Sequence, residues 1–213
     1  MPQFHYDVEQ GSEDWFQLRL GLPTASEFHT VLAKGEGKTR SKYMRRLAGE
    51  IITGKPAETY TNAHMERGKV MEGEARSLYA FRHDVEPVLV GFIKNGGAGC
   101  SPDSLIGDDG MVEFKTALPD IVIEKIIGDR FPAEHVAQCQ GNLWIAERDW
   151  IDCVIYSPDM VPFEKRAYRD EAYIKNLADE VERFNEDLAA MVARVRRYGS
   201  MKDDLKASLE ATA

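Results

Sequence analysis

The sequence predicts one α/β domain in which a mixed β-sheet is flanked by helices. Apolar residues recur at three- and four-residue spacing over much of the first 81 residues and again near the C-terminus, which is the period of a helix. Short runs rich in β-branched and aromatic residues occupy the middle of the chain, as is typical of strands. A chain of 213 residues fits one large domain in which both kinds of element pack in layers.

The first part of the chain is predicted to be helical after an irregular opening over residues 1–11. Ser12 can cap the first helix, which Gly21 ends. Thr24 and Glu27 fit a capping box and should open the second helix, because their side chains can bond each other's backbone N–H groups. In residue numbers, the expected helices are 13–20, one that begins at 24–27, 41–52 and 62–81.

Strands begin after Pro87, and two of them are expected to form a hairpin. A long helix closes the chain, and Gly199 is expected to end it before a polar tail. The expected strands are 88–93, 103–106, 111–116, 150–156 and 163–168, the last as an edge strand, and the expected helices are 121–127, 132–145 and 173–195.

The hairpin carries the residues with the clearest chemical potential. Its two apolar arms flank Gly107-Asp-Asp-Gly110, and Asp-Gly between apolar runs is a strong signal for a tight turn. If the arms pair about this turn, Asp103 lies near Glu113, and Glu113 shares one face of its strand with Lys115. Whether Asp103 joins that face depends on the register, which the sequence leaves open by one residue.

In the favourable register, two carboxylates and one ammonium group converge. Two carboxylates in one place repel each other unless a cation lies between them, and ligands that are all oxygens suit Mg²⁺ or Mn²⁺. A lysine beside such a cation can orient water or stabilise developing negative charge, so these are the parts of a phosphodiester-cleaving site. The spacing alone also fits a simpler interpretation, in which Asp103 is a turn residue and Glu113 and Lys115 face solvent.

The formal net charge of −9 is unusual for a nucleic-acid-binding protein, but binding depends on where the charges lie. The segment 34–46 is strongly basic and contains one acidic residue, Glu36. It either contacts phosphates or forms a solvated helix face, and the segment taken alone favours neither. Its basic residues are Lys34, Lys38, Arg40, Lys42, Arg45 and Arg46.

Cysteine content and hydropathy indicate a reducing environment away from membranes. The three cysteines, Cys100, Cys139 and Cys153, are odd in number and far apart, so free thiols are expected rather than a disulfide framework. No apolar run approaches the roughly 20 residues of a membrane span, and the N-terminus lacks the basic and apolar regions of a secretory signal. A cytoplasmic location is therefore expected.

Four segments of the chain, in order, resemble those of one nuclease family. Pro102-Asp103, nine further residues and then Glu113-Phe-Lys115 match the PD-(D/E)xK nuclease motif. Together the segments cover about residues 13–156 and resemble the phage lambda exonuclease family of viral recombination nucleases. The resemblance implies a restriction-endonuclease-like fold, with one exonuclease domain over 1–199 and a C-terminal tail over 200–213. The segments are 18–27, 68–76, 100–103 and 137–140 with Trp144.

The resemblance assigns a metal site to residues from two parts of the chain. Asp103 and Glu113 would ligate a divalent metal, with the backbone carbonyl of Phe114 as a further ligand. Glu72 would be an additional acidic ligand or would position water. Glu74 is its competitor, but Glu72 aligns with the family's glutamate. The implied cofactor is Mg²⁺, with Mn²⁺ as a substitute.

Four further residues receive roles from the resemblance. Lys115 would orient the attacking water and stabilise the pentavalent phosphate, and Gln138 would lie beside the nucleophile or the metal. Arg19 and Ser26 match positions that hold the 5′-phosphate of a DNA end, which suits the anion preference of a helix start and of arginine. The alternatives are an ion pair for Arg19, helix capping for Ser26 and a bond to nearby backbone for Gln138.

The activity implied by the resemblance is Mg²⁺-dependent 5′→3′ digestion of double-stranded DNA from its ends. It would release 5′-mononucleotides and leave a 3′ single strand for phage homologous recombination by single-strand annealing. Besides DNA ends, the implied partners are further copies in a ring-shaped homo-oligomer (trimer or tetramer) and a single-strand-annealing recombinase, in a bacterial host of a phage or prophage. Two alternatives stay open: a structure-specific or restriction-like endonuclease, and a non-catalytic DNA-binding module that loads an annealing partner.

Overall fold

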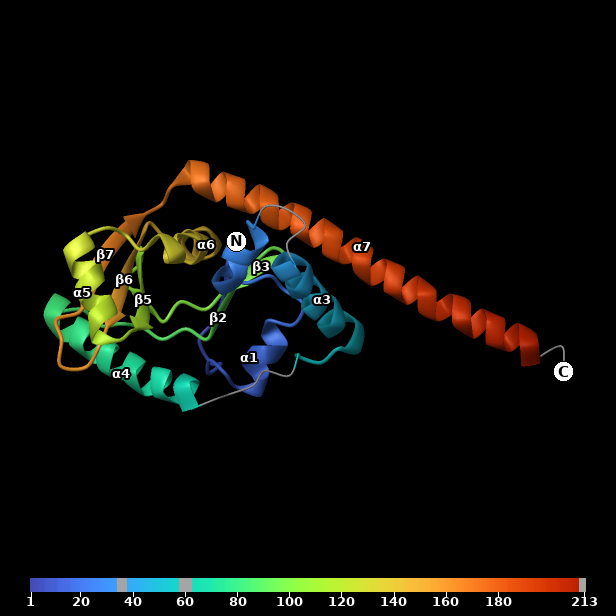
Figure 1. Cartoon of the computed structure of the whole chain (residues 1–213), viewed down its shortest axis with the longest axis horizontal. Coiled ribbons are helices and arrows are strands. Elements are labelled where there is room, and N and C mark those ends of the chain that lie inside the picture. The colour runs from blue at the N-terminus through green and yellow to red at the C-terminus, as the bar shows by residue number, and fades with distance from the viewer. Residues whose placement is uncertain (34–37, 58–62, 211–213) are drawn as a thin grey trace.

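Two β-sheets form the centre of the molecule, and helices pack around them (Figure 1). The computed structural model describes residues 1–33, 38–57 and 63–210, with the backbone alone over 63–69 and 199–210. One sheet is antiparallel, with the strand order β1-β2-β3, and the other has the order β4-β5-β6-β7. The strands are β1 Gln3–His5, β2 Phe92–Asn95, β3 Ala98–Cys100, β4 Ser104–Ile106, β5 Gly110–Thr116, β6 Trp150–Tyr156 and β7 Phe163–Tyr168.

The larger sheet is mixed, as the sequence predicts. β5 and β6 are parallel, whereas β4 and β7 run antiparallel to their neighbours, and β7 lies at the edge. A parallel pair needs a crossover connection, which α5, η2 and α6 supply. The helices are α1 Glu13–Leu18, η1 Ala25–Glu27, α2 Phe28–Val31, α3 Lys38–Thr53, α4 Ala63–His83, α5 Pro119–Gly128, η2 Ala133–His135, α6 Val136–Ala146 and α7 Glu171–Glu210.

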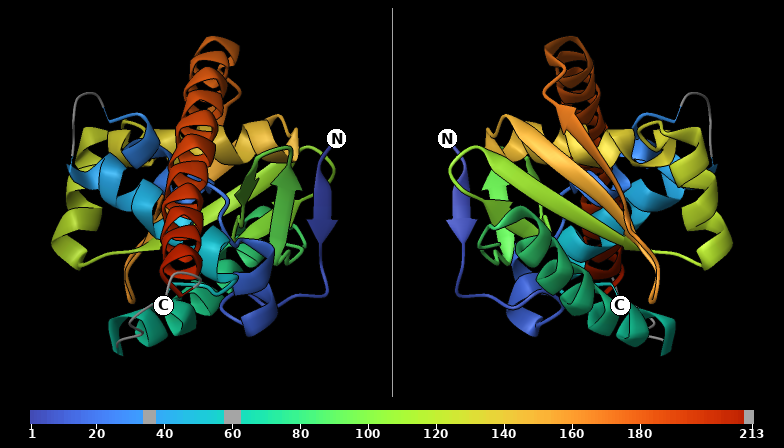
Figure 2. Two further views of the ribbon diagram at one scale, coloured as in Figure 1. Left: turned by 90° about the vertical axis from the view of Figure 1, so that its right-hand side faces the viewer. Right: turned by 90° about the vertical axis from the view of Figure 1, so that its left-hand side faces the viewer.

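Helices α4 and α6 cover opposite faces of this sheet (Figures 1 and 2). On β5, Val112 and Phe114 join Tyr79 of α4 in one apolar cluster. Met111, which alternates with them, belongs to the larger core that α6 and α7 complete, where the three cysteines lie buried as free thiols, as predicted. Because side chains alternate along a strand, Glu113 faces α6 and not α4.

The smaller sheet departs from the sequence prediction. The opening residues 1–11, expected to be irregular, contain β1, and the strand expected over 88–93 lies at β2 instead. Val88 forms only an isolated bridge, with Leu105 of β4. β3 is short and contains residues with little intrinsic β preference, so its pairing with β2 rather than its composition makes it a strand.

The capping box expected at Thr24 and Glu27 is wrong. Thr24 precedes η1, but its side chain makes no capping bond. Its hydroxyl accepts instead from Arg19, and the carboxylate of Glu27 is bonded by Arg46 of α3. Both members of the expected pair have charged partners, and these replace the reciprocal bonds of the capping box. Ser12, by contrast, caps α1 as predicted.

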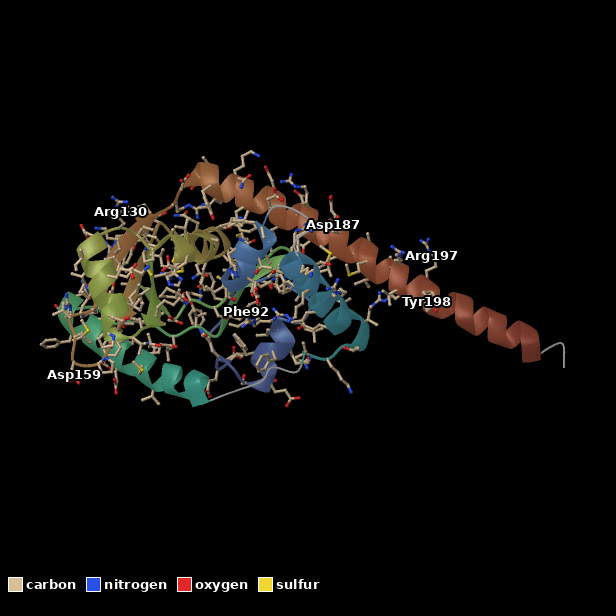
Figure 3. All side chains as sticks on the ribbon, viewed as in Figure 1. Phe92, Arg130, Asp159, Asp187, Arg197 and Tyr198 are labelled. Atoms are coloured by element: carbon tan, nitrogen blue, oxygen red, sulfur yellow. The ribbon has the colours of Figure 1, made fainter. Side chains whose placement is uncertain are left out.

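Helix α7 is longer than expected, because it continues through Gly199 to Glu210. A glycine costs a helix about 1 kcal/mol relative to alanine, which is too little to end a helix of 40 residues. Asp187 marks the part of α7 that packs along the body, whereas Arg197 and Tyr198 mark the part that extends beyond it (Figure 3). Neither α7 nor any other helix among the described residues is long and apolar enough to cross a membrane.

Candidate active site

The pairing of β4 with β5 decides the register that the sequence leaves open. Ser104 pairs with Val112, so Asp103, one position before β4, lies opposite Glu113. Residues that lie opposite each other in an antiparallel pair project from the same side of the sheet. Asp103 therefore shares the α6-facing side with Glu113 and Lys115, and the structure brings the three side chains together.

Arg148, which follows α6, holds this hairpin at its turn. Its Nη1 donates to the carbonyl oxygens of Gly107 and Gly110 at 2.9 and 2.7 Å, and more weakly to that of Ile106 at 3.4 Å. Gly107 has a φ of +53°, a conformation that glycine adopts without strain. One guanidinium thus bonds both ends of the turn, and a slip of the register by one residue would break these bonds.

Glu113 is almost completely buried, at 2% exposure, and both oxygens of its carboxylate accept hydrogen bonds. Oε1 accepts from Nζ of Lys115 at 2.8 Å and from Nε2 of Gln138 at 2.5 Å. Oε2 accepts from Nδ2 of Asn142 at 3.0 Å. Gln138 and Asn142 both come from α6, so that helix holds the carboxylate from the side opposite to α4. Three donors compensate for the loss of water that burial of a charged group requires.

Asp103 is also buried, at 9% exposure, and its Oδ2 accepts from the backbone N–H of Phe114 at 2.6 Å. Burial raises the pKa of Asp103 well above its usual range, and the neighbouring carboxylates of Glu113 and Glu72 raise it further. The ammonium of Lys115 and the bond from Phe114 oppose this shift. The charged form of Asp103 is therefore short of positive charge in its surroundings.

Lys115 is paired with Glu113 at 2.8 Å and stays protonated. Burial lowers the pKa of its ammonium group, but the charges of Glu113 and Asp103 and the bond to Glu113 outweigh burial and raise the pKa above its usual value. Its side chain is 29% exposed, so it reaches from the buried carboxylates toward solvent. A permanent positive charge in this position can stabilise negative charge on a bound phosphate.

Glu72 reaches the same site from α4. Its charge contributes to the raised pKa of Asp103, and its Oε1 forms an ion pair with Arg76 one helical turn later. Arg76 also donates from Nε to Oγ of Ser104 at 2.9 Å and from Nη2 toward the carbonyl of Asp103 at 3.4 Å. Glu74 is exposed and accepts from a tyrosine of β6 instead. The fold thus places Glu72, rather than its competitor, beside the hairpin.

The carboxylate oxygens of Asp103 and Glu113 are suitable ligands for a divalent cation. Two buried carboxylates lie opposite each other, and their repulsion is a cost that a cation would remove. The ligands that these side chains offer are oxygen atoms, which suits Mg²⁺ or Mn²⁺. As they stand, the side chains of the described residues contain no group of three or more His, Cys, Asp or Glu arranged as a metal site. Glu72 would be a further ligand, with one of its two carboxylate oxygens held by Arg76. The role of the Phe114 carbonyl as a ligand stays a prediction.

The residues expected at the 5′-phosphate, Arg19 and Ser26, lie in one polar cluster with Thr24. Nη2 of Arg19 donates to Oγ1 of Thr24 at 3.2 Å, and this oxygen lies 3.4 Å from Oγ of Ser26. The guanidinium lies over the ring of Trp15, 3.7 Å from its centroid. Burial lowers the pKa of Arg19 to about 10, which leaves it charged at neutral pH. Because η1 and α2 span only three and four residues, the helix-dipole contribution expected at Ser26 is small.

Two contacts connect this cluster to the hairpin. Thr24 forms an isolated parallel bridge with Gly99 of β3, whose N–H donates to the carbonyl of the residue before Thr24 at 3.1 Å. Nε1 of Trp15 donates to Oγ of Ser101 at 3.0 Å, two residues before Asp103. Residues 101–103, between β3 and β4, therefore contact Trp15, on which Arg19 is stacked, at one end and carry the first carboxylate of the site at the other.

The arginines of the basic segment are partly neutralised by the protein itself. Arg40 pairs with Asp187 of α7 at 3.1 Å, and Arg46 pairs with Glu27 at 3.2 Å. Lys34 lies outside the described residues. Two of the six basic residues of this segment thus hold α3 against α7 and η1. Arg46 remains close enough to the Arg19 cluster to influence the pKa of Arg19.

Three contacts at the site go beyond the sequence prediction. Asn142 lies four residues after Gln138 and therefore on the same helix face, a spacing that could have indicated it. Arg76 lies one turn after Glu72, inside a segment already singled out. Arg148 has no local signal, because its partners are backbone carbonyls far away in the sequence.

Comparison with known proteins connects this geometry to a family. The family model described as the YqaJ-like viral recombinase domain matches residues 14–149. The alkaline exonuclease LHK-Exo from Laribacter hongkongensis is 31% identical over 89% of this chain and 99% of its own, with a TM-score of 0.81. LHK-Exo in complex with dAMP gives 31% identity over the same shares and a TM-score of 0.82. A phage-related exonuclease from Haemophilus somnus 129PT, 15% identical over 82% of this chain and 96% of its own with a TM-score of 0.59, shows the fold alone.

No match was found among curated proteins. The family match nevertheless spans more than half of the chain, and the similarity to LHK-Exo extends over nearly all of that enzyme. The resemblance to lambda-type exonucleases that four short segments indicate is confirmed, as is the mixed α/β fold with helices on both sides. This chain belongs to the YqaJ-like viral recombinase family.

Proposed function

We propose that this protein is a metal-dependent exonuclease that digests duplex DNA from its 5′ ends. Family membership and similarity to an alkaline exonuclease support hydrolysis of DNA phosphodiesters. The observation that carries the proposal is the convergence of Asp103, Glu113 and Lys115 on one face of the hairpin, with Gln138 bonded to Glu113. Buried carboxylates beside a fixed ammonium group are suited to hold a cation and a phosphate at one place.

Asp103 and Glu113 hold a divalent metal in this proposal, Mg²⁺ or Mn²⁺, with Glu72 and the carbonyl of Phe114 as further ligands. When bound, the metal supplies Lewis-acid chemistry at the phosphate and lowers the pKa of water. Lys115 orients the attacking water and stabilises the negative charge of the pentavalent phosphate. Its raised pKa supports this role, because the ammonium group remains charged throughout the neutral and mildly alkaline range.

Gln138 completes the arrangement around the attacking water. Its amide N–H and the ammonium of Lys115 share Oε1 of Glu113, which keeps the two side chains next to each other. The amide oxygen of Gln138 can then accept a hydrogen bond from the water that Lys115 orients. Positioning by two fixed groups lowers the entropic part of the barrier to attack.

End recognition is assigned to the cluster of Arg19, Thr24 and Ser26. A charged, partly desolvated guanidinium and two hydroxyl groups suit a terminal phosphate. Anchoring a 5′-phosphate beside a hydrolytic centre would release 5′-mononucleotides in the 5′→3′ direction and leave a 3′ strand for single-strand annealing in phage recombination. A ring of three or four copies around the duplex, in the cytoplasm of a bacterial host and together with an annealing recombinase, belongs to the same proposal.

The experiment compares three substrates in the presence of Mg²⁺: linear duplex with 5′-phosphates, linear duplex with 5′-hydroxyls, and closed circular duplex. The expected result is early release of the 5′-terminal label as mononucleotide, faster from the phosphorylated end, with the circle intact. Equal cutting of the circle would favour the endonuclease alternative. No cutting of any substrate with Mg²⁺ or Mn²⁺ would favour the DNA-binding module, and an Asp103→Ala variant that digests like the wild type would show that the assigned site is wrong.

A further inference from the structure

The two oxygens of Glu113 are bonded unequally. Oε1 accepts from Lys115 and Gln138, whereas Oε2 accepts from Asn142. Each oxygen of an ionised carboxylate offers about two lone-pair directions to donors. Among the residues that the structure describes, donors occupy both directions on Oε1 and one on Oε2. One acceptor direction is therefore left on this carboxylate, and the bond from Asn142 determines where it points.

Asn142 is fixed by the packing of its own helix. The residue is 1% exposed. The preceding residue, Gly141, lets α6 approach α2 so closely that an added Cβ would lie 2.4 Å from the ring of Phe28. Because Gly141 fixes α6 against α2, the next residue, Asn142, presents its amide to Glu113 from a fixed backbone position.

We propose that Asn142 is a positioning residue for the metal site. It fixes the Glu113 carboxylate so that a divalent cation binds the one acceptor direction left on Oε2, while Oε1 stays with Lys115 and Gln138. This inference rests on the proposed metal-dependent function. An amide suits the position because it donates a hydrogen bond without adding charge. An acidic residue there would repel Glu113, and a basic one would compete with the cation.

A purely structural role for Asn142 makes a different prediction. A buried carboxylate needs hydrogen bonds for the stability of the fold as well, so a loss of stability alone does not distinguish the two roles. Metal affinity does. Groups that orient a metal ligand typically change metal affinity by about 10- to 100-fold when they are removed, whereas a residue that only fills the core leaves the affinity of a folded protein unchanged.

The test measures Mn²⁺ binding to the metal-free full chain by calorimetry, without DNA. Asn142→Leu keeps the approximate shape and removes the donor, and we expect its dissociation constant for Mn²⁺ to rise at least about tenfold. Gln140→Met is the matched control, because it removes a buried amide from the same helix without touching Glu113. We expect that control to stay within about twofold of the wild type, as for independent sites.

Digestion of linear duplex supplies a second measurement. Because Asn142 is buried behind Glu113, its loss should lower kcat and leave KM for DNA ends unchanged. Thermal unfolding without metal checks that each variant is folded. If Asn142→Leu does not fold, Asn142→Ser carries the test, because its shorter side chain withdraws the donor from Oε2 without adding bulk, and the same direction of change is expected.

The outcomes separate this inference from the proposed function. Unchanged Mn²⁺ affinity in a folded Asn142 variant, with binding lost in Glu113→Gln, would overturn the role of Asn142 and leave the proposed function intact. If Glu113→Gln and Asp103→Asn both bind Mn²⁺ like the wild type, the metal site itself is wrong and both proposals fail. Weaker Mn²⁺ binding in the Asn142 variants, with unchanged Mn²⁺ binding in Gln140→Met, supports the inference.

Discussion

The hairpin site and the Arg19 cluster are built in opposite ways. Glu113 is 2% exposed and accepts three hydrogen bonds of 2.5 to 3.0 Å. Ser26 is exposed, and the contacts that connect it through Thr24 to Arg19 are longer, at 3.2 and 3.4 Å. A buried charge that accepts several short hydrogen bonds keeps a fixed geometry, as a hydrolytic step requires. Ser26, which is exposed, and Arg19, which is partly buried, are held by longer contacts and can bind a ligand that arrives from solvent.

This difference suggests a division of labour between chemistry and recognition. Substitutions in the hairpin should change the rate and metal dependence of hydrolysis without changing which end is preferred. Substitutions in the Arg19 cluster should change the preference for 5′-phosphate and leave metal binding intact. Arg76 connects α4 to the hairpin, and the Tyr79 hydroxyl connects α4 to β6. Substitutions of these two residues therefore test how far the contacts of α4 support the site.

The largest effect is expected from Asp103→Asn. Removing one of two carboxylates should lower the rate on 5′-phosphorylated linear duplex by at least about 100-fold, because the remaining group holds a cation poorly. Asp108→Asn, which removes an exposed carboxylate from the turn of the same hairpin, is the matched control and should retain the wild-type rate. A rate for Asp103→Asn within tenfold of the wild type would contradict the assignment of the site.

A smaller effect is expected from Arg19→Gln, and it should concern selectivity. Loss of a charged hydrogen bond to phosphate corresponds to about 1.5–3 kcal/mol, or roughly a 10- to 100-fold lower preference for 5′-phosphate over 5′-hydroxyl ends. Arg45→Gln, an exposed arginine of α3 bonded to Ser41, is the control. If Arg19→Gln weakens Mn²⁺ binding and keeps the end preference, the proposed division between the two regions is wrong.

Arg76→Gln tests the support of the site from α4. The variant loses the ion pair to Glu72, so the carboxylate is no longer held beside Asp103, and we expect about a tenfold lower kcat. Arg82→Gln, on the same helix and paired with Glu164 of β7, should leave kcat unchanged. Equal kcat values for the two variants would mean that Glu72 is not needed and that the hairpin works alone.

The smallest effect on activity is expected from Tyr79→Phe. Its hydroxyl donates to Oδ2 of Asp152 at 2.6 Å, between α4 and β6, and Arg166 also bonds that carboxylate. Loss of the hydroxyl should lower the free energy of unfolding by about 1–2 kcal/mol, measured with urea, and leave the rate of digestion unchanged. A lower rate of digestion without a loss of stability would mean that the Tyr79 hydroxyl contributes to the activity of the site itself.

The sequence by itself determined the hairpin, the family and most of the elements. Asp103, Glu113 and Lys115 could be predicted together because one tight turn connects them, and turn chemistry is local. The period of apolar residues likewise located the long helices, since each reports one face of its own element. The Ser12 cap was predictable for the same reason, and Gln138 and Glu72 came from segments shared with the family.

Only the tertiary structure decided the register and the partners of these residues. Asp103 shares a face with Glu113 because β4 pairs in one register, which Arg148 holds from more than 35 residues away. The bond from Asn142 to Glu113 and the ion pair of Arg76 with Glu72 both depend on how helices pack on the hairpin. The same holds for Glu27, whose carboxylate is bonded by Arg46 of α3 instead of taking part in the predicted capping box. Local structure follows from the spacing of residues along the sequence, whereas contacts between distant segments form only when the chain packs.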